Sequence, residues 1–198
     1  MTAMALELLL FFSIFFAAAF FWPTYRLWRR ERINALVLPY DDSAHGMVGR
    51  WFRVTLIGMS LFLAALALGL PPAAAGPLPW LEQPVVRNIG WGLLALSLVW
   101  VVAAQAQMGA SWRIGIDAGT RLPLVTTGIF ALSRNPIFLG MRGSLLGLFL
   151  VLPNAFTLAI LLVGEVLIQV QVRLEEAHLL ASHGPQYEAY RQSVRRWI

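Results

Sequence analysis

Long runs of apolar residues are the feature that most restricts the fold of this chain. Runs that approach the roughly 20 residues needed to cross a bilayer as a helix occupy residues 4–22, 54–70, 88–108, 137–152 and 155–172. Only 13% of the residues are charged, against about 25% in an ordinary soluble domain. The sequence therefore predicts an all-α fold, a polytopic transmembrane helix bundle with about five membrane spans.

The length and composition limit what else the chain can contain. With 198 residues, we expect a single integral membrane domain over residues 1–198 and no separate cofactor-binding domain. The chain has no cysteine, which excludes disulfides, thiolate zinc sites and cysteine nucleophiles, and its histidines lack metal-ligand spacing, so no metal is expected. The G-x-S-x-G, H-E-x-x-H, phosphate-loop and G-x-G-x-x-G motifs are absent from the sequence. An enzyme of this sequence therefore needs a membrane-specific site.

Positive charge is distributed unevenly along the chain. All 15 basic residues are Arg, and 13 of them lie in residues 23–53, 109–136 and 173–198. Because such residues are retained on the cytoplasmic side, we expect an integral membrane protein with an outside amino terminus and a cytoplasmic carboxyl terminus. Topology then explains the net charge of +5, and nucleic acid is not an expected partner. Arg195, Arg196 and Trp197 are interpreted as an interfacial anchor.

Two residues, Pro153 and Asn154, separate the last two apolar runs, which predicts an antiparallel helical hairpin. Arg142 lies eleven residues before Pro153 and Glu165 eleven residues after Asn154, so both lie about 16 Å below the turn at 1.5 Å per residue. An internal ion pair is the favoured interpretation, because intramembrane charges usually find a partner. The alternative is that one of the two charges lines a substrate cavity.

Two cytoplasmic segments are where chemistry could take place. In residues 109–136, Asn135 and Pro136 precede the fourth apolar run, where Asn suits a helix cap and Pro the first turn. The free amide groups of such a helix start suit a carboxylate or phosphate, although capping alone accounts for the pair. In residues 173–198, Gly184-Pro185 predicts a break between two short helices. The acidic pair at 175 and 176 has a solvated helix face as its simplest interpretation.

Five short pieces of the second half of the chain form a recognisable pattern. They are G-A-S-W-R-I-G-I-D (109–117), L-V-T-T-G-I-F (124–130), R-N-P-I-F-L-G (134–140), E-E (175, 176) and H-G-P-Q-Y-E-A-Y-R (183–191). In this order and around a helical hairpin, they resemble the isoprenylcysteine carboxyl methyltransferase-like family of integral membrane methyltransferases, which includes phospholipid methyltransferase relatives. The resemblance runs from about Met108 to the end of the chain and favours a bacterial branch, which implies a place in the bacterial inner (cytoplasmic) membrane.

The resemblance implies an S-adenosylmethionine-dependent methyltransferase embedded in the membrane. Its acceptor would be a lipophilic or small molecule carrying a carboxylate, amine or thiol, with membrane lipid around it and no metal. A cytoplasmic loop and the C-terminal helices would build the cofactor pocket. The residues that the resemblance assigns to the cofactor are Leu124, Val125, Phe130, Asn135, Pro136, Ile137, Phe138, Glu175 and Glu176.

The same resemblance implies residues for the acceptor and for the reaction. In the family, an Arg shortly before the acidic pair is associated with substrate, and Arg173 is the nearest candidate. Asn135 and Arg113 complete the expected catalytic set with Arg173. Asp117 is a further substrate candidate, because a polar pair of Arg113 and Asp117 inside an ordered apolar loop needs partners.

The chain departs from the Arg-His-Pro-x-Tyr motif of the family. Asn135 stands in place of the His and Phe138 in place of the Tyr, and Phe130 also replaces a Tyr. Asn135 can hydrogen-bond a cofactor but cannot accept a proton near neutral pH. Methyl transfer from a sulfonium tolerates this change, because positioning and desolvation supply most of the acceleration. Two alternatives stay open: a membrane NADPH-dependent reductase of the sterol-reductase-like type, and a non-catalytic membrane protein that keeps the fold.

Overall fold

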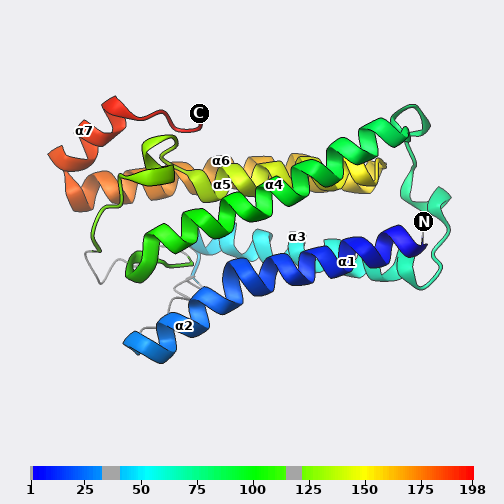
Figure 1. The fold of residues 1–198 in the computed structure, drawn as a ribbon, viewed down its shortest axis with the longest axis horizontal. Helices are drawn as coiled ribbons and strands as arrows, with labels where there is room; N and C mark the ends of the chain where they lie inside the picture. The colour runs from blue at the N-terminus through cyan, green and yellow to red at the C-terminus, as the bar shows by residue number, and fades with distance from the viewer. Residues whose placement is uncertain (1, 33–40, 115–121) are drawn as a thin grey trace.

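The computed structural model describes residues 2–32, 41–114 and 122–198. In these residues the fold is all-α, and apolar helices lie side by side in a bundle (Figure 1). The α-helices are α1 (Thr2–Phe16), α2 (Trp22–Glu31), α3 (Ala44–Ala67), α4 (Pro84–Met108), α5 (Pro136–Val151), α6 (Ala155–His183) and α7 (Pro185–Ser193). The prediction of an all-α membrane helix bundle is confirmed.

Four helical segments in the described part of the chain are long and apolar enough to cross a membrane: Thr2–Arg30, Ala44–Ala67, Pro84–Met108 and Ala155–His183. They indicate an integral membrane protein, but the prediction of about five spans is too high. The expected span at 137–152 matches α5, which has only 16 residues. At 1.5 Å per residue this helix is about 24 Å long, shorter than the roughly 30 Å hydrocarbon core.

The first helix continues beyond the predicted end at Trp22. A π-helical turn, η1 (Ala17–Phe21), joins α1 to α2 without a break. Pro23 follows this turn, and proline lacks an N–H and crowds the carbonyl group four residues earlier. The wider π turn accommodates proline inside one continuous helix, so the segment runs to Arg30.

Two other helices also extend beyond their apolar runs. Helix α3 begins at Ala44 rather than at residue 54, and Ser43 caps it by accepting a hydrogen bond from the Gly46 amide. Helix α6 continues to His183 rather than ending at residue 172. Hydropathy marks only the part of a helix that suits hydrocarbon, so it did not detect the polar start of α3. The break predicted at Gly184-Pro185 is present, but the helix expected before it is the continuation of α6 and not a separate short helix.

The hairpin between α5 and α6 is confirmed. Asn154 caps α6 by accepting a hydrogen bond from the Thr157 amide at 2.9 Å. The turn lies against the connection between α3 and α4, where the Leu78 amide donates to the Pro153 carbonyl at 3.1 Å. The predicted ion pair of this hairpin is also present, with Arg142 Nε donating to Glu165 Oε2 at 2.7 Å.

Small residues let α4 and α5 approach closely along their length. A Cβ atom added at Gly140 would lie 2.4 Å from Val101 Cγ2, and one at Gly147 would lie 2.8 Å from Leu94 Cγ. Close approach of backbones through small residues is typical of helix packing in membranes. The contact fixes the start of α5, and therefore Asn135 and Pro136, against α4.

Candidate functional site

Helix α7 lies at the end of the bundle where α5 begins and α6 ends (Figure 1), and polar side chains meet there. We call this the site end. Glu176 lies on the last turns of α6, and Asn135 directly precedes α5. Helix α7 follows a sharp bend at Gly184, whose φ of +51° favours glycine, and it turns the chain back toward the start of α5. The segment that follows α7 therefore brings Arg196 next to Glu176.

Glu176 is the centre of this group, and its side chain is only 9% exposed. Its Oε1 accepts hydrogen bonds from Asn135 Nδ2 at 3.0 Å and from Arg134 Nη2 at 3.2 Å. Its Oε2 accepts one from Arg196 Nη2 at 2.7 Å. We call Arg134, Asn135, Glu176 and Arg196 the Glu176 cluster. Two guanidinium groups face one carboxylate, so the cluster carries a net positive charge.

Backbone carbonyl groups of residues 194–196 accept hydrogen bonds that fix the position of the cluster. The Arg134 amide donates to the Arg195 carbonyl at 3.0 Å, and Ser133 Oγ donates to the Arg196 carbonyl at 3.2 Å. The Arg134 side chain also donates to the Val194 carbonyl at 2.6 Å. Arg196, expected as part of an interfacial anchor, also pairs with Glu176, because a buried carboxylate needs a cationic partner.

Tyr187 and Tyr190 of α7 lie close to the cluster, and their ring centroids are 6.1 Å apart. Tyr190 donates a hydrogen bond to the Phe130 carbonyl at 2.6 Å, which ties α7 to the 3-10 helix η5 (Gly128–Ala131). Burial, with the nearby Glu176 charge, raises the pKa of Tyr187 to about 12. Tyr187 is therefore a neutral hydrogen-bond donor at any physiological pH.

Two buried donors of the site have no hydrogen-bond partner among the described residues. They are Nε of Arg134 and the hydroxyl of Tyr187, neither of which makes a hydrogen bond of ordinary geometry. The two side chains interact with each other, because the charge of Arg134 and a hydrogen bond from it lower the pKa of Tyr187 against the larger raising effects of burial and of the Glu176 charge. A buried donor left unsatisfied costs about 1–3 kcal/mol. A ligand that carries acceptor oxygen atoms would satisfy both donors, which is the main sign of a binding site here.

Several residues assigned to the cofactor by resemblance lie in or beside the cluster. Asn135 precedes α5 as expected, but its side chain makes no capping bond and donates to Glu176 instead. Pro136 is buried, and its carbonyl accepts a hydrogen bond from Trp100 Nε1 at 2.8 Å. Ile137 packs between the apolar groups that contain Val101 and Trp112.

The other expected cofactor residues lie around this core. Phe130 is buried under Tyr190, and Phe138 is half-buried on the first turn of α5. Glu175 is half-buried, and its carboxylate accepts a hydrogen bond from Gln171 at 2.9 Å. Leu124 and Val125 are half-buried in the extended segment that leads into η5. All of these remain expectations as cofactor contacts.

The expected catalytic set does not gather around Glu176 as one group. Arg173 is exposed, and its Nη1 donates to the carbonyl and the side chain of Gln169, one turn nearer the middle of α6. Arg113 is buried, and its Nη1 donates to the Trp112 carbonyl at 2.8 Å. Asp117 lies outside the described residues. Of the three expected catalytic residues, Asn135 is the one that contacts Glu176.

Sequence reasoning missed Arg134, Arg196 and Tyr187 as members of the site. Arg134 stood within the R-N-P piece, so the pattern contained it without a role. Arg196 is 20 residues from Glu176 along the chain, and only the bend at Gly184 brings them together. The sequence offered one indication of these partners, because a buried Glu at the membrane edge requires cationic side chains nearby.

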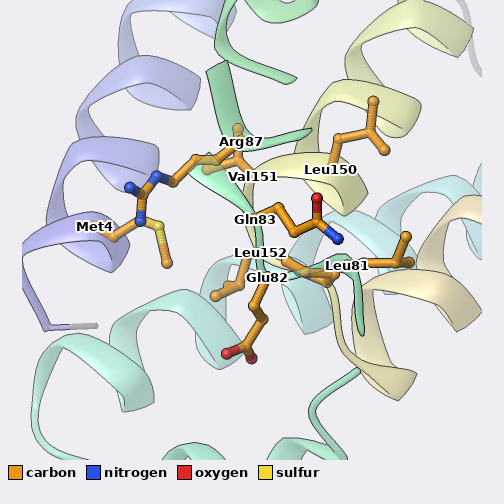
Figure 2. Close-up of a pocket in the computed structure, with 9 residues that line it drawn as sticks. Met4, Leu81, Glu82, Gln83, Arg87, Leu150, Val151 and Leu152 are labelled. Carbon is orange, nitrogen blue, oxygen red and sulfur yellow. The ribbon is translucent and has the colours of Figure 1, made fainter. Parts of the chain in front are cut away.

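A cavity of about 130 Å³ lies at the opposite end of the bundle (Figure 2). Its lining includes Met4, Glu82, Arg87 and Val151. Figure 2 shows the Arg87 side chain extended toward Met4 and the Glu82 carboxylate turned the other way. The lining contains no residue of the Glu176 cluster, so the cavity is separate from it.

No group of three or more His, Asp or Glu residues that could hold a metal occurs in the ranges that the structure describes.

Comparison with known proteins identifies the family. A sequence model described as phospholipid methyltransferase matches residues 86–186, about half of the chain. The match includes nearly all of α4, the whole of α5 and α6, and the start of α7, and it therefore contains Arg134, Asn135 and Glu176. No curated protein and no solved structure matches the chain. The matched segment agrees with the resemblance noted in the sequence, and the chain therefore belongs to the phospholipid methyltransferase family.

Proposed function

We propose that this protein is an S-adenosylmethionine-dependent methyltransferase that acts on a lipophilic or small acceptor in the membrane. Membership of the phospholipid methyltransferase family supports the reaction class. The observation that carries the proposal is the Glu176 cluster, with two buried unsatisfied donors at the end of an apolar bundle. A site in this position can bind a polar cofactor next to an acceptor that is dissolved in the membrane.

The residues of the site fit the cofactor. Arg134 Nε and the Tyr187 hydroxyl make no hydrogen bond of ordinary geometry, and both can donate to a carboxylate or to ribose oxygen atoms. Glu175 accepts one hydrogen bond, from Gln171, so its carboxylate can accept another from an amino group or a ribose hydroxyl. Aromatic rings such as Phe130 and Phe138 attract a positively charged sulfonium.

When bound, S-adenosylmethionine would supply an activated methyl group. The residues of the chain would bind and orient it and exclude water, which are the main requirements of an in-line displacement. Asn135 holds the Glu176 carboxylate and cannot take up a proton. An acceptor that already presents a lone pair, such as a carboxylate or an unprotonated amine, therefore suits this site best.

The first experiment measures cofactor binding by the purified protein in detergent. Isothermal titration with S-adenosylmethionine and separately with NADPH should give saturable binding of the first and no binding of the second. The Glu176→Gln variant should bind at least tenfold more weakly, because a charged partner of two Arg residues is lost. The Arg87→Gln variant, at the far end of the bundle, serves as the matched control. NADPH binding without S-adenosylmethionine binding would favour the reductase instead.

The second experiment tests transfer. Wild-type protein is incubated with methyl-labelled S-adenosylmethionine and a bacterial lipid extract, and the label is followed into the organic phase. Labelled product is expected, and its chemical nature would identify the acceptor. Cofactor binding with no transfer to any acceptor in the extract contradicts the enzyme and favours a non-catalytic protein that keeps the fold.

A further inference from the structure

A second group of polar side chains lies along α5 and α6, apart from the Glu176 cluster. Arg142 Nε donates to Glu165 at 2.7 Å, and Gln169 Nε2 donates to the other oxygen of Glu165 at 2.8 Å. Arg173 Nη1 donates to Gln169 Oε1 at 2.8 Å. We call these four residues the polar ladder. It is continuous from Arg173 to Arg142.

The polar ladder opens onto an apolar outer surface of the bundle. The side chains of Arg142 and Glu165 are 32% and 33% exposed. Leu146 lies one turn after Arg142, Leu162 lies three residues before Glu165 and Val166 directly follows it, and all three are exposed. An exposed apolar surface on a membrane-spanning helix faces lipid. A charged group there is costly unless it reaches the interface or finds a partner.

The position of Trp197 indicates that Arg142 reaches the interface. The Arg142 guanidinium carbon lies 4.4 Å from the centroid of the Trp197 ring, a cation–π contact. Trp197 is held at the site end by the hydrogen bonds of Arg195 and Arg196, and Trp is typical of the membrane–water boundary. Arg142 follows the first residue of α5 by six residues, about 9 Å, and helical side chains lean toward the start of their helix. Its guanidinium therefore lies near the level of lipid headgroups.

Arg142 also has hydrogen-bonding capacity to spare. Its Nε donates to Glu165, while no residue in the described ranges accepts a hydrogen bond from its two terminal amino groups. The Trp197 ring covers one face of the guanidinium, which leaves its edge available. The polar ladder contains two Arg and one Glu, so its net charge is +1. A guanidinium edge of this kind matches the paired oxygen atoms of a phosphate.

We propose that Arg142 and Trp197 form a binding site for the headgroup phosphate of an anionic membrane lipid at the site end of the bundle. Glu165 orients the guanidinium through Nε, and Trp197 limits it to one plane. The lipid tails lie over the exposed apolar residues of α5 and α6. The site is separate from the methyltransferase proposal, because its residues neither belong to the Glu176 cluster nor contact the proposed cofactor groups.

The test is lipid retention by the purified, delipidated full chain, measured by native mass spectrometry. The probes are phosphatidylglycerol, diacylglycerol with the same tails, and inorganic phosphate, all without S-adenosylmethionine. We expect one tightly retained phosphatidylglycerol and no comparable retention of diacylglycerol or inorganic phosphate. Arg142→Gln should weaken retention about tenfold, the effect of losing a charge-assisted hydrogen-bond pair. Arg87→Gln at the far end should retain phosphatidylglycerol as the wild type does.

A second variant keeps the test decisive if Arg142→Gln misfolds. Replacing both partners by apolar residues, Arg142→Leu with Glu165→Leu, removes the charges without leaving one unpaired, so the fold should persist. This double variant should keep the thermal midpoint of the wild type and lose the retained lipid. Equal phosphatidylglycerol retention in the double variant and the wild type would overturn the proposal. So would a dimer mass without lipid, which would assign the polar ladder to contact between two copies.

Discussion

Arg196, near the end of the chain, holds the carboxylate of Glu176 on α6 with two of its nitrogen atoms, Nη2 at 2.7 Å and Nε at 3.1 Å. This ion pair closes the site from the side of the C-terminal tail. It also places a second cation beside Arg134. The arrangement makes residues 194–196 part of the site.

Replacing Arg196 by Ala should destabilise the protein and weaken cofactor binding. Hydrogen bonds to charged groups are worth about 1.5–3 kcal/mol, and the lower value applies because the Arg196 side chain is about one third exposed. Thermal unfolding in detergent measures the first effect and titration with S-adenosylmethionine the second. Arg195→Ala is the control, because Arg195 is exposed and contributes its backbone carbonyl. Equal midpoints for the two variants would contradict this role of Arg196.

Tyr187 and Tyr190 form a matched pair of adjacent buried phenols with opposite expectations. The Tyr190 hydroxyl donates at 2.6 Å to the Phe130 carbonyl, so Tyr190→Phe should cost about 1 kcal/mol of unfolding free energy. The Tyr187 hydroxyl has no partner among the described residues, so Tyr187→Phe should leave the ligand-free protein as stable or slightly more stable.

The same pair separates a ligand contact from a structural one. If the Tyr187 hydroxyl donates to the cofactor, Tyr187→Phe should weaken S-adenosylmethionine binding about tenfold while the unfolding midpoint stays unchanged. Isothermal titration and thermal unfolding are the two readouts. A destabilised Tyr187→Phe with normal affinity would show that the hydroxyl serves the fold.

Stability should fall at high pH. Burial raises the pKa of both Tyr187 and Tyr190 to about 12, above the ordinary value of 10.0 for tyrosine. The folded state therefore keeps two protons that the unfolded chain releases, so this stabilisation is complete below about pH 10 and is lost as pH rises through 12. Circular dichroism of wild type and of the Tyr187→Phe, Tyr190→Phe double variant measures it. The helical signal of the double variant should fall less steeply than that of the wild type between about pH 10 and pH 12.

Arg142 and Glu165 should act as one unit in folding. Arg142→Ala and Glu165→Ala should each lower the yield of folded protein, because each leaves one charge unpaired in an apolar surface. The double change should cost less than the sum of the two single changes, since residues in direct contact are not additive. Size-exclusion yield of the three variants decides this, and two independent, additive losses would contradict the pair.

The α4–α5 contact gives a test of packing. Gly140→Ala should destabilise by about 1–3 kcal/mol, because the added methyl group would lie 2.4 Å from Val101 Cγ2 and a Val side chain in a helix is stiff. Gly92→Ala on α4 is the control, since nothing lies within 4 Å of the added atom there. Thermal unfolding should give a lower midpoint for the first and an unchanged or higher midpoint for the second.

Local features of the sequence were sufficient for much of the fold. Apolar runs located the helices, and the pairing of Arg142 with Glu165 followed from equal distances to one tight turn. Both inferences need only the rise of a helix and the cost of charge in hydrocarbon. The helix ends were less well predicted, because hydropathy does not detect the polar extension to Arg30 or the start of α3 at Ala44.

The sequence by itself determined an all-α membrane bundle, a helical hairpin with an ion pair between its two helices, and a family pattern around Asn135 and the acidic residues. Only the tertiary structure decided that Glu176 is held by Arg134 and Arg196, and that Asn135 donates to Glu176 instead of capping α5. The physical reason is the range of the interactions. Helix formation depends on neighbours within a few residues, whereas a buried carboxylate takes its partners from whichever chain segments fold back to it.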